Sequence, residues 1–164
     1  NPKELNANAF KLIGDEWMLI TAGNTDNFNT MTASWGGVGV IWGKNVVWCV
    51  VRPTRYTYEF TEANDYFTLT FFNEKYRDAL MLCGTKSGRD CDKVAEAGFT
   101  PISGNNPDTT VFSEANLIIE CKKIYTQDID PDKFLDPEID TMYSENDYHR
   151  MYVGEILRCS VKAD

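Results

Sequence analysis

Short runs of β-branched and aromatic residues, separated by turn-forming residues, constrain the fold of this chain more than any other feature. The first three runs are six to eight residues long and are bounded by Gly, Asn, Asp or Pro. Runs of this length and composition are typical of β-strands. The strands expected on this basis span residues 17–22, 45–52, 65–72, 109–113, 115–125 and 150–161.

The run 65–72 indicates how its strand packs. Phe67, Leu69 and Phe71 would face one side of the strand, and the residues between them would face the other. This alternation is expected of a half-buried sheet.

Glycines interrupt the apolar residues that precede the second run, at positions 36, 37, 39 and 43. This pattern suits a strongly bent strand pair at a barrel corner. Trp17 and Trp48 lie within strand-like runs, so we expect both in the core.

Helices are expected at few places, with suitable composition at 54–64 and 74–83. A third helix is expected to begin at Ser87, because Ser87 and Asp90 resemble a capping box. Val94 and Ala95 would supply its buried face, and Gly98 would end it.

Strands and helices do not alternate regularly enough for a parallel, doubly wound sheet. The pattern favours a mainly β fold, an antiparallel barrel with a few added helices. The chain has 164 residues, of which 43% are hydrophobic and 13% aromatic. That is enough to bury a core without disulfides, and no repeat or linker divides it. We therefore expect a single domain over residues 1–164.

The formal net charge of −9 argues against nucleic acid and anionic membranes as partners. The longest apolar run, Val46 to Val51, is too short to span a membrane, and the first residues lack the apolar stretch of a signal peptide. The five cysteines form no C-x-x-C pair and no zinc or iron–sulfur spacing. Reduced thiols in a cytoplasmic protein are the expected state.

Basic residues gather in two windows against this acidic background, at Arg52, Arg55, Lys86, Arg89 and Lys93. In the first window, Arg52-Pro53-Thr54-Arg55-Tyr56-Thr57, a strand ends and a helix is expected to begin. Arginine makes bidentate charge-assisted hydrogen bonds, and a helix N-terminus offers free N–H groups, so the window suits a phosphate. A solvated turn with surface arginines would explain the same residues.

The second basic window is Lys86-Ser87-Gly88-Arg89-Asp90, which could form a second clamp on the same anion. A capping box explains Ser87 and Asp90 without any ligand, but it leaves Lys86, Gly88 and Arg89 unexplained.

A third window precedes both and mixes hydroxyl residues with an aromatic ring. It consists of Asn29, Thr30, Met31, Thr32, Ala33, Ser34 and Trp35, followed by Gly36. Donors in such a segment can approach a planar ligand closely. A polar strand followed by a turn has the same composition.

Together the windows resemble the flavin reductase-like family of FMN-binding split barrels. The stretches N-T-M-T-A-S-W, R-P-x-R-Y-T and L-C-G-T-K-S-G-R-D occur in the family's order and spacing, and the resemblance spans residues 10–160. Three separated motifs in order are more specific than any one of them. The resemblance implies a Greek-key split barrel and a homodimer, with FMN in a groove near the subunit interface.

The resemblance also implies site residues. Thr32, Ala33, Ser34 and Trp35 would lie along the isoalloxazine ring and ribityl chain. Arg52, Arg55, Tyr56, Thr57, Ser87 and Arg89 would surround the phosphate. The other window residues expected to bind the cofactor are Asn29, Thr30, Met31, Lys86 and Gly88. The family tends to have a histidine shortly before a G-E-[IV] strand, and His149 before Gly154-Glu155-Ile156 fits that placement.

His149 is the only histidine, so a His-rich metal site is excluded. The resemblance makes His149 the candidate catalytic residue. A surface-loop histidine is the alternative. The acidic stretch before it, from Asp128 to Asp140, fails the EF-hand pattern, because Lys133 stands where the turn glycine belongs and Ile139 where the bidentate glutamate belongs. A solvated acidic loop, with no metal, is therefore expected.

The chain has no G-x-G-x-x-G motif and no P-loop, so NAD(P)H would have to stack on the flavin itself. The resemblance thus implies an NAD(P)H-dependent flavin reductase, in which hydride passes to flavin N5 and on to free flavin or another acceptor. Two alternatives remain open. One is a flavoredoxin-like, non-enzymatic FMN electron carrier that docks to partner proteins, and the other is a barrel that binds no flavin.

Overall fold

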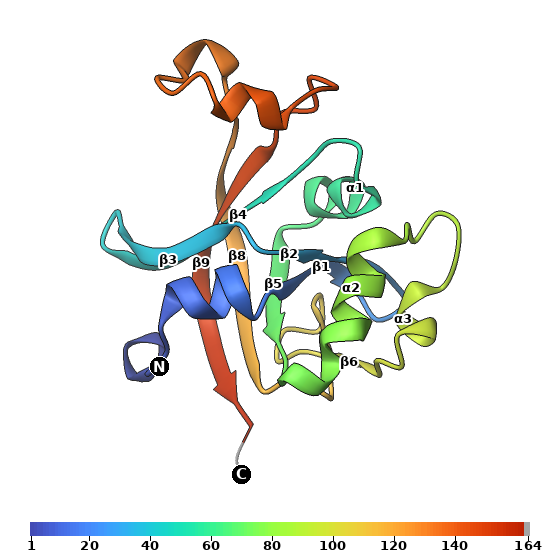
Figure 1. The fold of residues 1–164 in the computed structure, drawn as a ribbon. Coiled ribbons are helices and arrows are strands. Elements are labelled where there is room, and N and C mark those ends of the chain that lie inside the picture. The colour runs from blue at the N-terminus through green and yellow to red at the C-terminus, as the bar shows by residue number, and fades with distance from the viewer. Residues whose placement is uncertain (163–164) are drawn as a thin grey trace.

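A seven-stranded antiparallel sheet forms the centre of the computed structural model, which describes residues 1–162 (Figure 1). Its strand order is β2-β1-β5-β8-β9-β4-β3, so β2 and β3 are the two edges of an open sheet. These strands are β1 (Met18–Asn24), β2 (Asn27–Ala33), β3 (Gly36–Ile41), β4 (Lys44–Val51), β5 (Tyr66–Phe71), β8 (Leu117–Asp128) and β9 (Arg150–Val161). The mainly β, antiparallel split barrel expected from the sequence is confirmed.

Shorter elements surround this sheet. The helices are α1 (Tyr56–Ala63), α2 (Arg77–Thr85) and α3 (Lys93–Glu96), and β6 (Pro101–Ser103) pairs with β7 (Thr110–Phe112). Short helical turns lie at Pro2–Glu4, Lys11–Asp15, Glu74–Tyr76, Pro131–Lys133 and Ile139–Met142. The six expected strands and the first two expected helices are thus confirmed, with ends shifted by a few residues.

Strand β5 is buried on both faces, so the half-buried sheet expected from its sequence is wrong. Phe67, Leu69 and Phe71 pack into one apolar cluster of the barrel. Phe72 belongs to a second cluster, where it packs against Phe99. The second face is covered because α2, α3 and the β6–β7 hairpin pack over it (Figure 1).

The helix expected to begin at Ser87 begins instead at Lys93. Asp92 is its N-cap and accepts a hydrogen bond from the Ala95 N–H, whereas the Ser87 hydroxyl accepts from the N–H of Arg89. Ser87 therefore stabilises a turn, and the helix ends before Gly98 as expected. The expected buried face is confirmed at Val94, which packs against the second cluster, and wrong at Ala95, which is exposed while Lys93 is buried.

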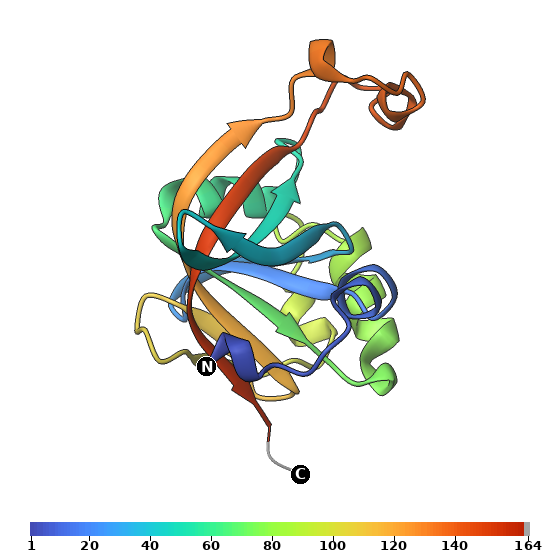
Figure 2. The ribbon, with the colours of Figure 1, turned by 90° about the vertical axis from the view of Figure 1, so that its left-hand side faces the viewer.

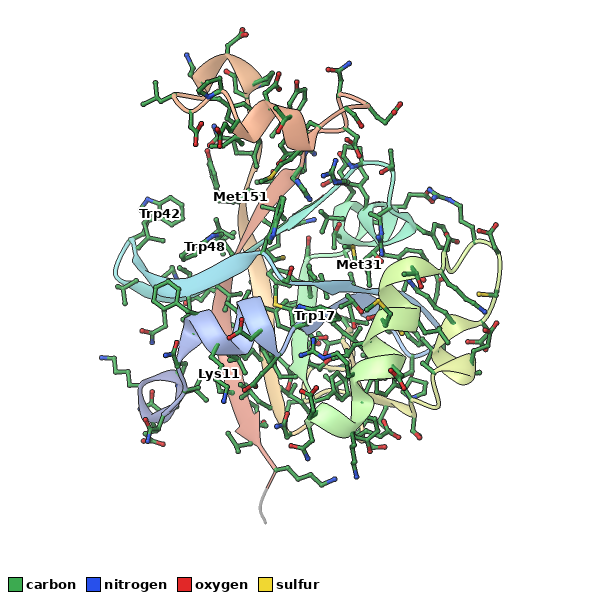
Figure 3. All side chains as sticks on the ribbon, viewed as in Figure 1. Lys11, Trp17, Met31, Trp42, Trp48 and Met151 are labelled. Atoms are coloured by element: carbon green, nitrogen blue, oxygen red, sulfur yellow. The ribbon has the colours of Figure 1, made fainter. Side chains whose placement is uncertain are left out.

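The strand pair expected around the glycines at positions 36, 37, 39 and 43 is confirmed, and its strands β3 and β4 form a hairpin at the edge of the sheet. Trp42 and Gly43 form its turn, both with positive φ, as a type I′ turn requires. A Cβ on Gly37 would lie 2.1 Å from the Trp48 ring, so glycine leaves room for the indole. Trp48 is 36% exposed, which contradicts its expected place in the core, and Figure 3 shows it on the same side of β3 as Trp42.

Strands β8 and β9 extend beyond the other strands of the sheet, and residues 129–149 connect them at that end (Figures 1 and 2). We call residues 129–149 the arm. The Ile129 N–H donates to the His149 carbonyl at its base, where Arg150 also pairs with Asp128 at 2.7 Å and with Glu62 at 2.8 Å. The acidic residues from Asp128 to Asp140 are exposed, as expected of a solvated loop. No helix within residues 1–162 is both long and apolar enough to cross a membrane.

Candidate functional site

A pocket of about 210 Å³ opens where β2 ends, β4 ends and α1 begins. We call it the Trp35 pocket. Its lining joins residues from two of the sequence windows and from the end of the arm: Met31, Thr32, Ala33, Ser34, Trp35, Val50, Arg52, Arg55 and His149. The fold therefore brings together segments that lie more than 100 residues apart in the sequence.

Helix α2 supports the β2 side of this pocket. The Thr32 hydroxyl donates to the Leu80 carbonyl, and a Cβ on Gly84 would lie 3.3 Å from Thr32. Thr30 lies away from the pocket, because its fully buried hydroxyl contacts Thr21 and the Ile20 carbonyl. The structure therefore places Thr32 to Trp35 at the pocket and Thr30 in the interior.

Arg55 immediately precedes α1 and carries the most informative polar group of the site. Its Nη2 atom is buried and has no hydrogen-bond partner among the residues that the structure describes. Burial lowers the pKa of this guanidinium from its ordinary value. Because buried charged donors are normally hydrogen-bonded, this orphaned group indicates an anionic ligand.

A second cation lies close to Arg55. Lys93 is 3% exposed, and its ammonium donates to the carbonyls of Cys83 at 3.0 Å and Lys86 at 3.1 Å. Burial, with a smaller contribution from Arg55, lowers the pKa of Lys93 to about 8. No ion pair to Arg55 or Lys93 occurs within residues 1–162, so the positive charge here is not neutralised by a described carboxylate.

Lys93 lines a neighbouring pocket of about 440 Å³, which we call the Lys93 pocket, together with Phe28, Asn29 and residues 88–94. Sequence reasoning placed Lys93 among the basic residues but not in the site, because the segment resembled an amphipathic helix. The signal available was a lysine five residues before Gly98 in an acidic chain, and this pattern is too general to identify a ligand-binding residue.

Asn29 links the windows. Its side-chain amide donates to the Thr57 hydroxyl at 2.8 Å. A Cβ on Gly88 would lie 2.1 Å from Asn29 Oδ1 and 3.3 Å from the Tyr56 ring. All three windows therefore meet beside the start of α1, and glycine at position 88 permits the close approach.

The other basic residues of the windows already have acceptors. Arg89 pairs with Glu59 at 2.5 Å and lies 4.7 Å from the centre of the Tyr56 ring, and Lys86 pairs with Glu96. These ion pairs are exposed, and exposed pairs contribute little, so both cations can exchange partners at small cost.

Arg52 points toward the arm. It pairs with Asp147 at 2.5 Å, donates to the Met142 carbonyl at 2.9 Å and stacks over the Tyr143 ring at 4.8 Å. The sequence did not indicate Asp147 or Tyr143, which contact Arg52, or Val50, which lines the pocket. These positions depend on the tertiary packing of the arm and the strands.

His149 is 8% exposed, which excludes the surface-loop alternative. Its Nδ1 atom is 2.8 Å from the Tyr143 hydroxyl, and its ring centre is 5.2 Å from that of Trp35. Burial and the charge of Arg52 lower the pKa of His149 to about 4, although Asp147 opposes this shift. The imidazole is therefore neutral at pH 7 and can act as a hydrogen-bonding group rather than as a cation.

The arrangement suits a ligand with a flat part and an anionic part. The Trp35 pocket offers backbone and hydroxyl groups beside an indole, and the Arg55 guanidinium lines it. Lys93 adds a buried positive charge in the neighbouring Lys93 pocket. A metal site is not indicated, since no group of three or more His, Cys, Asp or Glu side chains within residues 1–162 is placed to hold an ion.

Comparison with known proteins agrees with this fold. The family model described as "Flavin reductase like domain" matches residues 11–164. A comparison with curated protein sequences gives no match.

Similar solved structures include a flavoredoxin from Methanosarcina acetivorans, with a TM-score of 0.71 and 21% identity over 90% of this chain and 68% of that one. An FMN-binding protein from Thermus thermophilus has a TM-score of 0.68 and 16% sequence identity, over 88% of this chain and 69% of that one. An NADH:FAD oxidoreductase from Streptomyces globisporus C-1027 has a TM-score of 0.66 and 14% sequence identity, over 90% of this chain and 75% of that one. At these identities the likeness establishes the fold alone.

Proposed function

Because the chain belongs to the family of flavin reductase like domains, we propose that it binds FMN and works as an NAD(P)H-dependent oxidoreductase. The observation that carries the proposal is the buried Arg55 guanidinium, whose Nη2 atom lacks a partner among the described residues. A phosphate would supply the missing acceptor.

The residues present fit FMN. Arg55 and Lys93 would hold the phosphate, and Arg89 can join them by giving up its exposed pair with Glu59. Thr32 to Trp35 would lie along the ring and ribityl chain, because they line the pocket beside Arg55. This pocket is smaller than the roughly 300–1,000 Å³ of typical ligand sites, so we expect a second subunit to cover the rest of the flavin.

FMN, when bound, would supply the redox chemistry by accepting hydride from a nicotinamide at N5 and releasing electrons to free flavin or another acceptor. The chain itself would bind, orient and shield it. Neutral His149, held by Tyr143, would offer a hydrogen-bonding nitrogen without adding charge beside the ring. The NADH:FAD oxidoreductase from Streptomyces globisporus has the same fold, which supports a nicotinamide donor.

The test is to mix FMN-loaded protein with NADH or NADPH under anaerobic conditions and follow the flavin absorbance. Rapid bleaching with one nicotinamide is expected. Bound FMN that neither nicotinamide bleaches would contradict the reductase and favour a non-enzymatic electron carrier.

The carrier is the second candidate, and two observations favour it. A flavoredoxin is among the similar structures, and the exposed arm is rich in acidic residues that could dock to a basic partner. In that case a partner protein would reduce the bound FMN, and another would reoxidise it. A protein that stays colourless, with fluorescence and Tm unchanged by FMN, would contradict both candidates.

We also propose a homodimer in the cytoplasm. Large apolar side chains are exposed beside the β3–β4 hairpin, among them Phe10 (90%), Val40 (72%) and Trp42 (59%). Exposed apolar clusters of this kind mark association surfaces, and a second copy would cover them. The five thiols are all unpaired, which suits a reducing compartment.

A further inference from the structure

Arg52 was expected at the phosphate, but its contacts point in another direction. One guanidinium nitrogen pairs with Asp147 at 2.5 Å, the other donates to the Met142 carbonyl at 2.9 Å, and the group lies over the Tyr143 ring. All three partners belong to the last eight residues of the arm. Arg52 itself follows the end of β4, so these contacts tie the arm to the barrel.

The contacts continue from Arg52 into the Trp35 pocket. Tyr143 is 4% exposed, and its hydroxyl meets His149 Nδ1 at 2.8 Å. The His149 ring in turn lies against Trp35, and both line the pocket with Arg55. A chain of contacts therefore runs from Arg52 through Tyr143 to the imidazole of His149.

We infer that Arg52 is a positioning residue: it holds residues 142–147 of the arm against the barrel, so that His149 forms one wall of the Trp35 pocket. Arg55, rather than Arg52, then faces the anion. As a statement about flavin binding this inference rests on the function proposed above, but the position of His149 can be measured on protein without flavin.

Asp147→Asn is the variant that separates positioning from simple electrostatics. It removes the charge that pairs with Arg52 while leaving Arg52 in place. The charged groups that affect the pKa of His149 are Arg52, which disfavours the imidazolium, and Asp147, which favours it; Arg55 lines the same pocket. If the arm stayed in place, loss of Asp147 would lower the pKa of His149 further.

Release of the arm has the opposite effect on this pKa, because burial is the main cause of the shift. We expect D147N to raise the pKa of His149 from about 4 toward its ordinary value of 6.5. The direct variant, Arg52→Ala, raises it under either explanation and is therefore less informative. Glu145→Gln is the matched control, because Glu145 is an exposed carboxylate two residues from Asp147, and it should leave the pKa unchanged.

The measurement is a pH titration of the imidazole signals by NMR, which needs no assignment because His149 is the only histidine. A higher pKa in D147N and an unchanged one in E145Q support the positioning role. An unchanged or lower pKa in D147N overturns it.

Flavin binding gives a second readout. If Arg52 positions the pocket wall, D147N weakens FMN and riboflavin by the same factor, since both carry the ring. If Arg52 binds phosphate, D147N frees it and strengthens FMN alone, which overturns the inference. Wild-type protein that binds neither flavin would contradict the proposed function, while the titration without flavin would still decide the role of Arg52.

Discussion

Arg55→Met removes the guanidinium that faces the proposed phosphate and keeps an unbranched side chain of similar reach. In the protein without ligand, Arg55 Nη2 is buried with no partner among the described residues, and burial lowers the pKa of the group. The charge therefore destabilises the ligand-free fold. With FMN bound, the same group would donate to a phosphate oxygen.

The variant should consequently affect binding and folding in opposite directions. A hydrogen bond to a charged group contributes about 1.5 to 3 kcal/mol, which corresponds to an FMN affinity about 10 to 150 times weaker. Riboflavin lacks the phosphate, so its affinity should not change. The Tm of the ligand-free protein should stay the same or rise, because methionine needs no partner in the interior.

The assay is a fluorescence titration with FMN and with riboflavin, followed by thermal unfolding with and without FMN. Arg158→Met is the matched control, because Arg158 is exposed near the far end of β9. An equal loss of affinity for both flavins, or a lower Tm without ligand, would contradict a phosphate-binding role for Arg55. Either result would mean that Arg55 supports the fold and not the phosphate.

Three further predictions follow from the same site and surface. FMN affinity should fall as the pH rises through about 8, where Lys93 of the ligand-free protein loses its proton, while riboflavin affinity should not change. Between pH 8 and 10.5 the unfolded chain binds more protons at Lys93 than the folded protein does. The free energy of unfolding should therefore rise with pH in this range. Gly88→Ala should destabilise the protein by about 1 to 3 kcal/mol in chemical denaturation, because its Cβ would overlap Asn29, whereas Gly14→Ala meets no atom within 4 Å and should cost less. Val40→Glu should convert a dimer to a monomer in light scattering without unfolding it, and an unchanged mass would exclude this surface as the interface.

The strands were predictable because their signal is local. Runs such as 65–72 combine β-branched and aromatic residues between turn residues, and that composition predicts a strand wherever it packs. The burial of both faces of β5 was not predictable in the same way, because it depends on Phe99 and Phe112, which arrive from later in the chain.

The helix start shows where local reasoning fails. Ser87 and Asp92 are both reasonable N-caps, and the structure uses Asp92 because Gly88 lies against Asn29 and Tyr56, which keeps the preceding turn irregular. This contact involves residues from three separate sequence windows, so no single window predicts it.

The site was predictable to the extent that it follows short motifs. Thr32 to Trp35 and Arg55 lie together as their motifs indicated, and His149 reaches the same pocket. The burial of Lys93 and the engagement of Arg52 by Asp147 depend on packing between distant segments, so composition and spacing do not reveal them.

A crystal structure of the protein with FMN would show directly whether Arg55 binds the phosphate. We expect a phosphate oxygen within hydrogen-bond distance of Arg55 Nη2, with Lys93 nearby and the flavin ring beside Thr32 to Trp35. A flavin bound elsewhere, or a phosphate that leaves Arg55 Nη2 without a partner, would contradict it.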